Sequence, residues 1–192
     1  MSRQRELVEW FNKNLACPYE LSTRNQRLAH TCHDLAIEHH AAILLLCRAE
    51  LFGSMYSLLR VEFKALARGL WLRHVASNED IVKYETEDFR IGFGDILKQI
   101  ENRFGLASSV LSRLKNRQWD IFNSFTHTGY QALVRRVNST HTGPVNYNEE
   151  EVVSALRHAR LFAIFSVVEL AGMARDKTIL EPTMAMALKY GE

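Results

Sequence analysis

The sequence predicts an all-α fold, a single-domain bundle of about five to seven helices. Apolar residues recur at intervals of three and four over several long segments, which is the spacing that gathers them on one face of a helix. Helix breakers are scarce, with three prolines and nine glycines in the chain. Because 192 residues are enough for one sizeable core and short for two, we expect one domain over residues 1–192.

The first segment is predicted to be a short amphipathic helix. Its apolar residues at helical spacing are Leu7, Trp10 and Phe11. Pro18 terminates it, because proline cannot continue a helix. Ser22 can cap a second, long helix that runs to about residue 50, before a bend at Gly53. The domain therefore divides into an N-terminal helix and linker (1–20), a helical core (21–176) and a short C-terminal helix (177–192).

The helical core continues with a helix over 54–76 that carries one apolar stripe. The stripe consists of Leu59, Phe63, Leu66 and Leu70, at spacings of four, three and four. Residues 77–78 can begin a shorter helix. The two glycines in 91–95 predict a loop there, which leads into a helix over 96–104 that Gly105 ends.

The second half of the core holds two further long helices. Ser108 or Ser109 can cap the first, which ends near Thr126 or, after a kink at Gly129, near residue 137. The polar residues 138–148 predict a loop. Three glutamates at 149–151 suit the positive N-terminal end of the next helix, whose apolar body over 161–173 is expected at the centre of the core. Pro182 is expected to interrupt the last helix, 177–190.

Charge and cysteine content narrow the class of protein. The net charge of +2 is too small to indicate nucleic-acid binding by bulk electrostatics, so any such site must be local. Cys17, Cys32 and Cys47 form no CxxC pair and are odd in number, which is typical of free thiols in a reducing compartment. The charged N-terminus does not resemble a signal peptide, and no apolar run is long enough to span a membrane. We therefore expect a cytoplasmic protein.

Eight histidines raise the question of a metal site. Five of them lie in the first half of the chain, at His30, His33, His39, His40 and His74. No HExxH or paired ExxH arrangement brings a third ligand to any two of them. We therefore expect no metal and no cofactor, which disfavours a metal-dependent enzyme, and interpret these histidines as surface or edge residues.

A polar stripe precedes Gly129. Asp120, Asn123 and His127 stand at i, i+3 and i+7 of a helix whose other positions are bulky and apolar. Such a stripe can hold a histidine in a chosen tautomer, and a histidine exchanges protons near neutral pH, as general acid–base catalysis requires. The alternative is that His127 caps or buttresses the end of the helix through hydrogen bonds.

A basic lane runs along the helix over 54–76. Arg60, Lys64 and Arg68 recur every four residues, so they lie on one side of the helix, where three cations can bind a phosphate backbone. A solvated helix face often has the same pattern. Partial burial with internal ion pairs to Glu62 or Glu169 is a further alternative, because this helix is otherwise very apolar.

Three segments resemble an uncharacterised bacterial all-α family: Tyr56–Arg73, Asn123–Gly129 and Val167–Gly172. The resemblance covers roughly residues 22–175. That family is more distantly similar to helical proteins of the HEPN type, which are dimeric α-bundles, many of them RNA-cleaving toxins or defence effectors. The resemblance therefore implies a HEPN-like homodimer that acts on RNA, with an antitoxin or another protein as partner.

HEPN ribonucleases carry an arginine followed four to six residues later by a histidine. The pair lies at the dimer cleft and assists attack of a ribose 2′-hydroxyl on the adjacent phosphate without metal. Arg136 and His141 meet this spacing, but they fall in a predicted loop, and the pattern is frequent by chance. Arg117 precedes His127 by ten residues, about 15 Å of straight helix, so their cooperation would need a kink or a partner protomer.

Two functions are compatible with these residues. The leading hypothesis is a metal-independent ribonuclease or RNA-binding toxin or defence effector. In it His127 transfers a proton, Asn123 orients His127, and Arg117 or the Arg60 lane stabilises phosphate charge. The alternative is a non-catalytic dimerisation or protein-interaction module, in which the arginines and His127 form a buried polar network that fixes helix packing.

Overall fold

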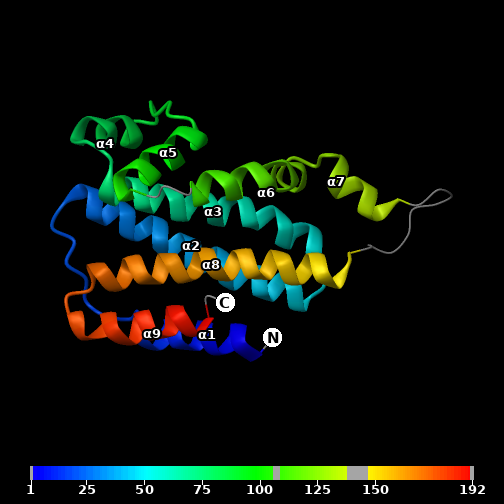
Figure 1. The fold of residues 1–192 in the computed structure, drawn as a ribbon, viewed down its shortest axis with the longest axis horizontal. Coiled ribbons are helices and arrows are strands. Elements are labelled where there is room, and N and C mark those ends of the chain that lie inside the picture. The colour runs from blue at the N-terminus through cyan, green and yellow to red at the C-terminus, as the bar shows by residue number, and fades with distance from the viewer. Residues whose placement is uncertain (1, 106–108, 138–146, 191–192) are drawn as a thin grey trace.

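The computed structural model describes residues 2–105, 109–137 and 147–190, in which helices lie side by side along the long axis (Figure 1). Three helices form the centre, α2 (Arg24–Arg48), α3 (Phe52–His74) and α8 (Glu149–Met173). α6 (Val110–Thr126) covers α3 on one side, and α9 (Leu180–Tyr190) packs on α8 on the other, beside α1 (Ser2–Asn14).

Shorter elements connect the long helices. They are α4 (Asn78–Glu85), α5 (Phe93–Phe104), α7 (Tyr130–Leu133) and two 3-10 turns at Val134–Arg136 and Lys177–Ile179. The described ranges thus hold nine α-helical segments and no strand, and seven of these helices have eleven residues or more. The predicted all-α fold is confirmed.

Capping side chains select several of the helix ends. α2 begins after Thr23, not after Ser22, because Thr23 and Gln26 form a capping box. The Thr23 hydroxyl accepts from the Gln26 backbone N–H at 3.2 Å, and the Gln26 side chain accepts from the Thr23 N–H at 3.1 Å. Ser77 caps α4 in the same way with Asp80.

Three predicted boundaries are wrong, each for a local reason. The bend lies at Glu50, which has a φ of 56°, so Gly53 falls inside α3. α5 begins at Phe93, because Gly92 takes an extended conformation and ends the loop early. The start of α6 after Ser109 agrees with the prediction, although the Ser109 side chain makes no capping hydrogen bond. Pro182 lies in the first turn of α9 and does not interrupt it, since an N–H there has no helical partner to lose.

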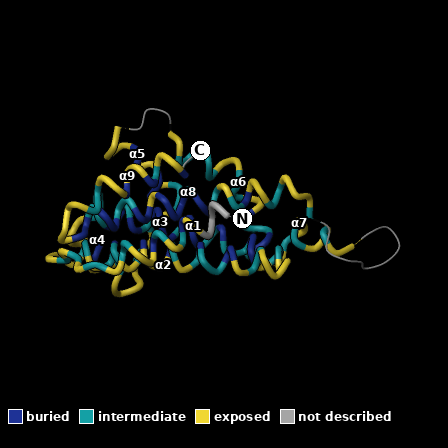
Figure 2. Tube along the Cα trace, turned by 90° about the horizontal axis from the view of Figure 1, so that it is seen from below, coloured by how far each residue is buried: buried dark blue, intermediate teal, exposed yellow. Residues whose placement is uncertain are grey.

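The core runs along α3 and α8, where buried residues concentrate in Figure 2. Phe63, Leu66 and Trp71 form one apolar cluster with α5, and Leu59 and Met55 form another with α6. A third cluster joins α1 and α9 to α8. The apolar body of α8 is therefore central, as predicted.

Two of the histidines interpreted as surface residues are fully buried, so that interpretation is wrong for them. His33 and His40 have no exposed surface. His33 Nδ1 lies 3.4 Å from the Ser166 hydroxyl, and His40 Nδ1 lies 3.5 Å from a carboxylate oxygen of Glu62, which is also fully buried. Burial lowers the pKa of each of these two histidines to about 4, so both are neutral at pH 7.

Candidate functional site

The end of α6 brings His127 against α3. His127 is the residue after the last turn of α6 and leaves the helical conformation, with a φ of −113°. Its ring Nε2 lies 2.7 Å from Nη1 of Arg60. A guanidinium only donates hydrogen bonds, so Nε2 accepts, and the ring proton of the neutral imidazole is on Nδ1. The contact therefore selects one tautomer of an exposed histidine.

An aromatic ring lies beside the same guanidinium. Arg60 lies over the indole of Trp119, 5.1 Å from the ring centroid, and Lys115 approaches that ring at 5.8 Å. Trp119 in turn stacks on Phe93 at 4.7 Å, with an interplanar angle of 17°. These contacts fix Trp119 between α3 and α5 and hold the Arg60 side chain in place.

The other two cations of the lane follow along α3. Arg68 lies over both Tyr84 and Phe89, 5.4 Å from each centroid. Lys64 is between the two arginines and partly buried. Burial lowers its pKa, and the positive charges of Arg68 and Arg60 lower it further. The basic lane predicted from the sequence therefore forms one continuous row of positive charge, the cationic row Arg60–Lys64–Arg68.

The predicted ion pairs between the lane and the two candidate glutamates are wrong. Glu62 faces the core beside His40, while Glu169 binds Arg73 at 2.7 Å and His74 at 2.8 Å. Burial opposes ionisation of Glu169, but the hydrogen bond from His74 and the charges of His74 and Arg73 outweigh it and lower its pKa. Within the described parts of the chain, Lys64 has no carboxylate partner.

The structure brings only some of the other predicted residues to His127. Asn123 contacts His127 through its backbone carbonyl, at 2.9 Å from the His127 nitrogen, and not through its side chain. The Asn123 side-chain oxygen is buried and has no hydrogen-bond partner. Arg117 is exposed on α6, ten residues before His127, and Asp120 is also exposed. His141, the partner suggested for Arg136, lies outside the described residues.

Chemically, the arrangement combines three elements of a phosphodiester site. A row of cations can bind successive phosphates, the aromatic rings beside the row can stack on bases, and a neutral imidazole lies at one end of the row. Sequence reasoning found the row but missed Trp119, Lys115 and the Arg60–His127 contact. In the described residues, no group of three histidine, cysteine, aspartate or glutamate side chains is placed to hold a metal ion.

Comparison with known proteins places the chain in one family. No curated protein and no solved structure matches it, so the resemblance to HEPN proteins stays a prediction. No helix in the described ranges is both long and apolar enough to cross a membrane. The chain belongs to the family of unknown function DUF6988, whose model matches residues 33–192.

Proposed function

We propose that the protein binds RNA along the Arg60–Lys64–Arg68 row and cleaves it without a metal, with His127 transferring the proton. The observation that carries the proposal is the 2.7 Å contact between Arg60 and His127. It pairs a permanent cation with an exposed imidazole, which is the chemistry implied by the resemblance to HEPN ribonucleases. Arg60 takes the role for which Arg117 was the other candidate.

The reaction follows from the tautomer that Arg60 selects. A phosphate of the RNA replaces the imidazole as the partner of the Arg60 guanidinium, and this frees Nε2 of His127. Nε2 takes the proton of the neighbouring ribose 2′-hydroxyl, O2′ bonds to phosphorus, and the bond from phosphorus to O5′ breaks. The leaving O5′ takes up a proton from water, and the hydroxide that forms takes the proton from Nε2 of His127, which restores the neutral ring. The products are a 2′,3′-cyclic phosphate and a 5′-hydroxyl.

Replacing His127 by glutamine should lower the rate of RNA cleavage about 100-fold, because a glutamine cannot take the proton. The measurement is cleavage of a labelled RNA in the presence of EDTA, with a substrate that carries 2′-deoxyriboses as a second reference. Folding should be unaffected, since His127 is exposed. His39→Gln, on α2, is the matched control and should cleave like the wild type. Equal cleavage by wild type and His127→Gln would exclude the catalytic role.

Replacing Lys64 by alanine should weaken RNA binding about three- to ten-fold through the loss of one phosphate contact. The slope of the logarithm of affinity against the logarithm of salt concentration should also fall by about one. Binding is measured by filter retention of a 2′-O-methyl oligonucleotide, which cannot be cleaved. Lys98→Ala, an exposed lysine of α5 that pairs with Asp95, should change neither quantity. If both alanine variants behave alike, the row is not the RNA-binding surface.

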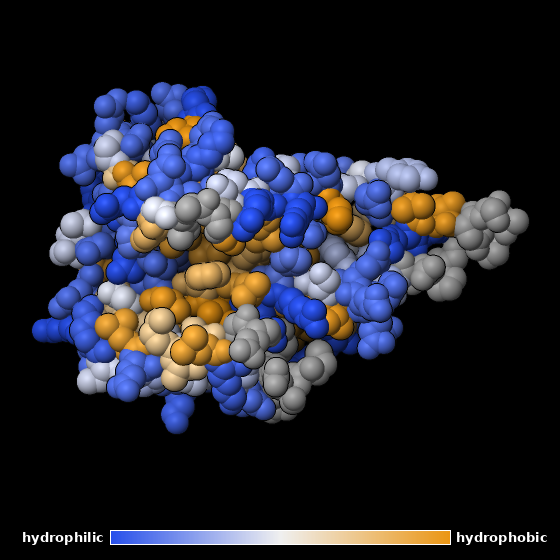
Figure 3. Space-filling view, viewed as in Figure 1, coloured by the Kyte–Doolittle hydropathy of each residue, from blue (hydrophilic) through white to orange (hydrophobic). Residues whose placement is uncertain are grey.

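A second candidate, a dimerisation or interaction module, is favoured by one surface. Figure 3 shows apolar side chains gathered over α8 and α9. On these two helices, Phe165, Met184 and Leu188 are 53%, 50% and 74% exposed. Apolar areas of this kind are typical of protein–protein contacts. This candidate predicts that RNA stays intact with the wild type as well as with His127→Gln, so the cleavage measurement separates the two. Both proposals are compatible with a homodimer and with an antitoxin as the partner.

A further inference from the structure

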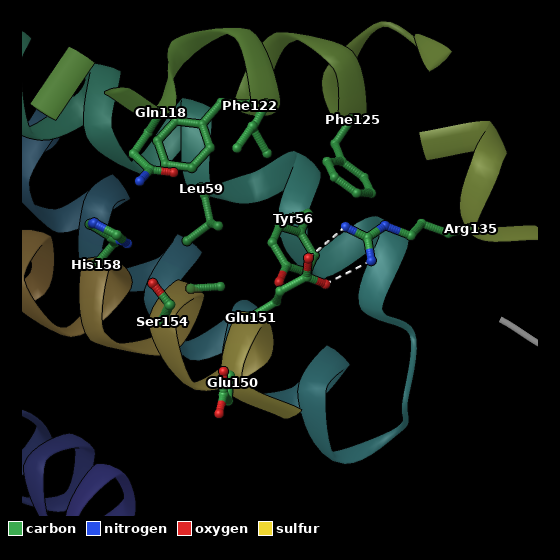
Figure 4. A pocket seen from close by; sticks show the side chains of 12 residues that line it. Tyr56, Leu59, Gln118, Phe122, Phe125, Arg135, Glu150, Glu151, Ser154 and His158 are labelled. Atoms are coloured by element: carbon green, nitrogen blue, oxygen red, sulfur yellow. Dashed lines mark hydrogen bonds and ion pairs between the residues drawn. The ribbon is translucent and has the colours of Figure 1, made fainter. Parts of the chain in front are cut away.

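A cavity of about 320 Å³ lies between α6 and α8, with α3 as its floor (Figure 4). Its walls include the buried side chains of Leu59, Phe122 and Phe125. The polar side chains of Gln118 and Ser154 also line it. Its volume is at the lower end of the range for ligand sites, and its walls combine apolar and aromatic side chains with polar and charged ones.

One buried polar group of the cavity has no partner. Tyr56 is 7% exposed, and its hydroxyl group has no hydrogen-bond partner in the structure. Its ring is held by stacking on Phe125, with centroids 4.7 Å apart. Burial raises the pKa of Tyr56, so the hydroxyl keeps its proton. A buried donor without an acceptor is unfavourable, and a ligand atom that accepts from it would remove that cost.

The positive charge of Arg135 at the cavity is already neutralised by a carboxylate. Arg135 binds Glu151 with two hydrogen bonds, of 2.7 and 2.8 Å, drawn as dashed lines in Figure 4. A phosphate or carboxylate ligand would have to break this pair. Burial lowers the pKa of His158, so this lining residue is neutral at pH 7. Glu150 adds a negative charge at the mouth, which disfavours anions further.

The remaining features select a flat, uncharged ligand with hydrogen-bonding edges. Aromatic and aliphatic walls suit the faces of a ring, and the neutral groups of Tyr56, Gln118 and Ser154 suit its edges. From these groups we infer that the cavity is a binding site for an uncharged nucleobase, either of a free nucleoside or of an RNA strand. The inference does not rest on the proposed cleavage, because none of its residues belongs to the cationic row.

The test is calorimetric titration with adenosine, guanosine, cytidine and uridine, and with the 2′-O-methyl oligonucleotide. Tyr56→Phe keeps the ring and removes only the hydroxyl, so it should weaken binding about ten-fold. Tyr147→Phe is the matched control. The Tyr147 hydroxyl is also without a partner, but Tyr147 stacks on Tyr56 from outside the cavity, so its loss should leave binding unchanged. Ser154→Phe places a ring into the cavity from an exposed position and should abolish binding.

The two sources of the base give different results. Binding of at least one nucleoside that Tyr56→Phe weakens supports a free-nucleoside site. Binding of the oligonucleotide alone, weakened by both Tyr56→Phe and Ser154→Phe, supports a base of a strand. Lys64→Ala should weaken the oligonucleotide and no nucleoside, so the row and the cavity are tested separately. The inference is overturned if neither probe binds at millimolar concentration, or if Ser154→Phe binds like the wild type.

Discussion

Replacing Gly69 by alanine should lower the free energy of unfolding by about 1–2 kcal/mol, although alanine is the better helix former. Gly69 lies in the middle of α3 beneath the imidazole of His33. A Cβ at this position would be 2.5 Å from His33 Nε2 and 2.6 Å from its Cε1. The ring is fully buried and cannot swing into solvent. The steric cost therefore exceeds the gain of about 1 kcal/mol in helix propensity.

Urea unfolding followed by circular dichroism measures this difference. Gly94→Ala is the control, because a Cβ there would meet only the flexible Lys115, at 3.7 Å, so this change should be neutral or slightly stabilising. In the double variant His33→Ala, Gly69→Ala the ring is absent, and with it the clash. The double variant should therefore lose less stability than the sum of the losses in the two single variants. Unchanged stability of Gly69→Ala would mean that α2 and α3 can separate without cost.

Acidification from pH 7 to pH 4 should remove roughly 3 kcal/mol of stability for each of His33 and His40. Burial lowers the pKa of each imidazole from 6.5 to about 4 in the folded chain. The positive charge of Arg160 lowers that of His40 further, whereas the carboxylate of Glu169 partly opposes the shift of His33. The unfolded chain therefore binds more protons below pH 6.5, and stability falls until about pH 4.

Glu62 has the opposite effect on the pH dependence of stability. Burial raises its pKa well above 4.5, so its contribution to stability is lost as pH rises above that value. The effect of one histidine is isolated by comparing the wild type with His33→Asn in urea unfolding between pH 7 and pH 4. In His33→Asn, the free energy of unfolding should depend less steeply on pH, because the contribution of His33 is absent. His39→Gln, on the partly exposed side of α2, should keep most of the wild-type pH dependence. A His33→Asn protein with the wild-type slope would contradict this prediction.

The fold was largely predictable from the sequence because helix periodicity is a local property. The helix ends were less predictable, since they depend on which side chain reaches which backbone group, as with Gln26 and Thr23. The burial of His33 and His40 had a usable signal. They lie seven residues apart, on the face of α2 that also carries the buried residues Ala29, Ala36 and Ile43.

The candidate site was predictable only where it lies on one helix. The row of Arg60, Lys64 and Arg68 follows from a spacing of four residues. The contact between Arg60 and His127 joins residues 67 positions apart, and the periodicity of a single helix gives no information about such a pair. The cavity is built from three helices that are distant in the sequence, so it too appears only when they pack.

The close approach of the His33 ring to Gly69 also limits how α2 and α3 can be aligned. The His33 imidazole packs against a part of α3 that carries no side chain, and α3 offers this at one position only. A slide of α2 by one turn in either direction would bring the ring over Ala65 or Arg73. Leucine and alanine side chains alone would allow neighbouring alignments of similar energy. This close contact therefore contributes more to the uniqueness of the helix pairing than to its strength.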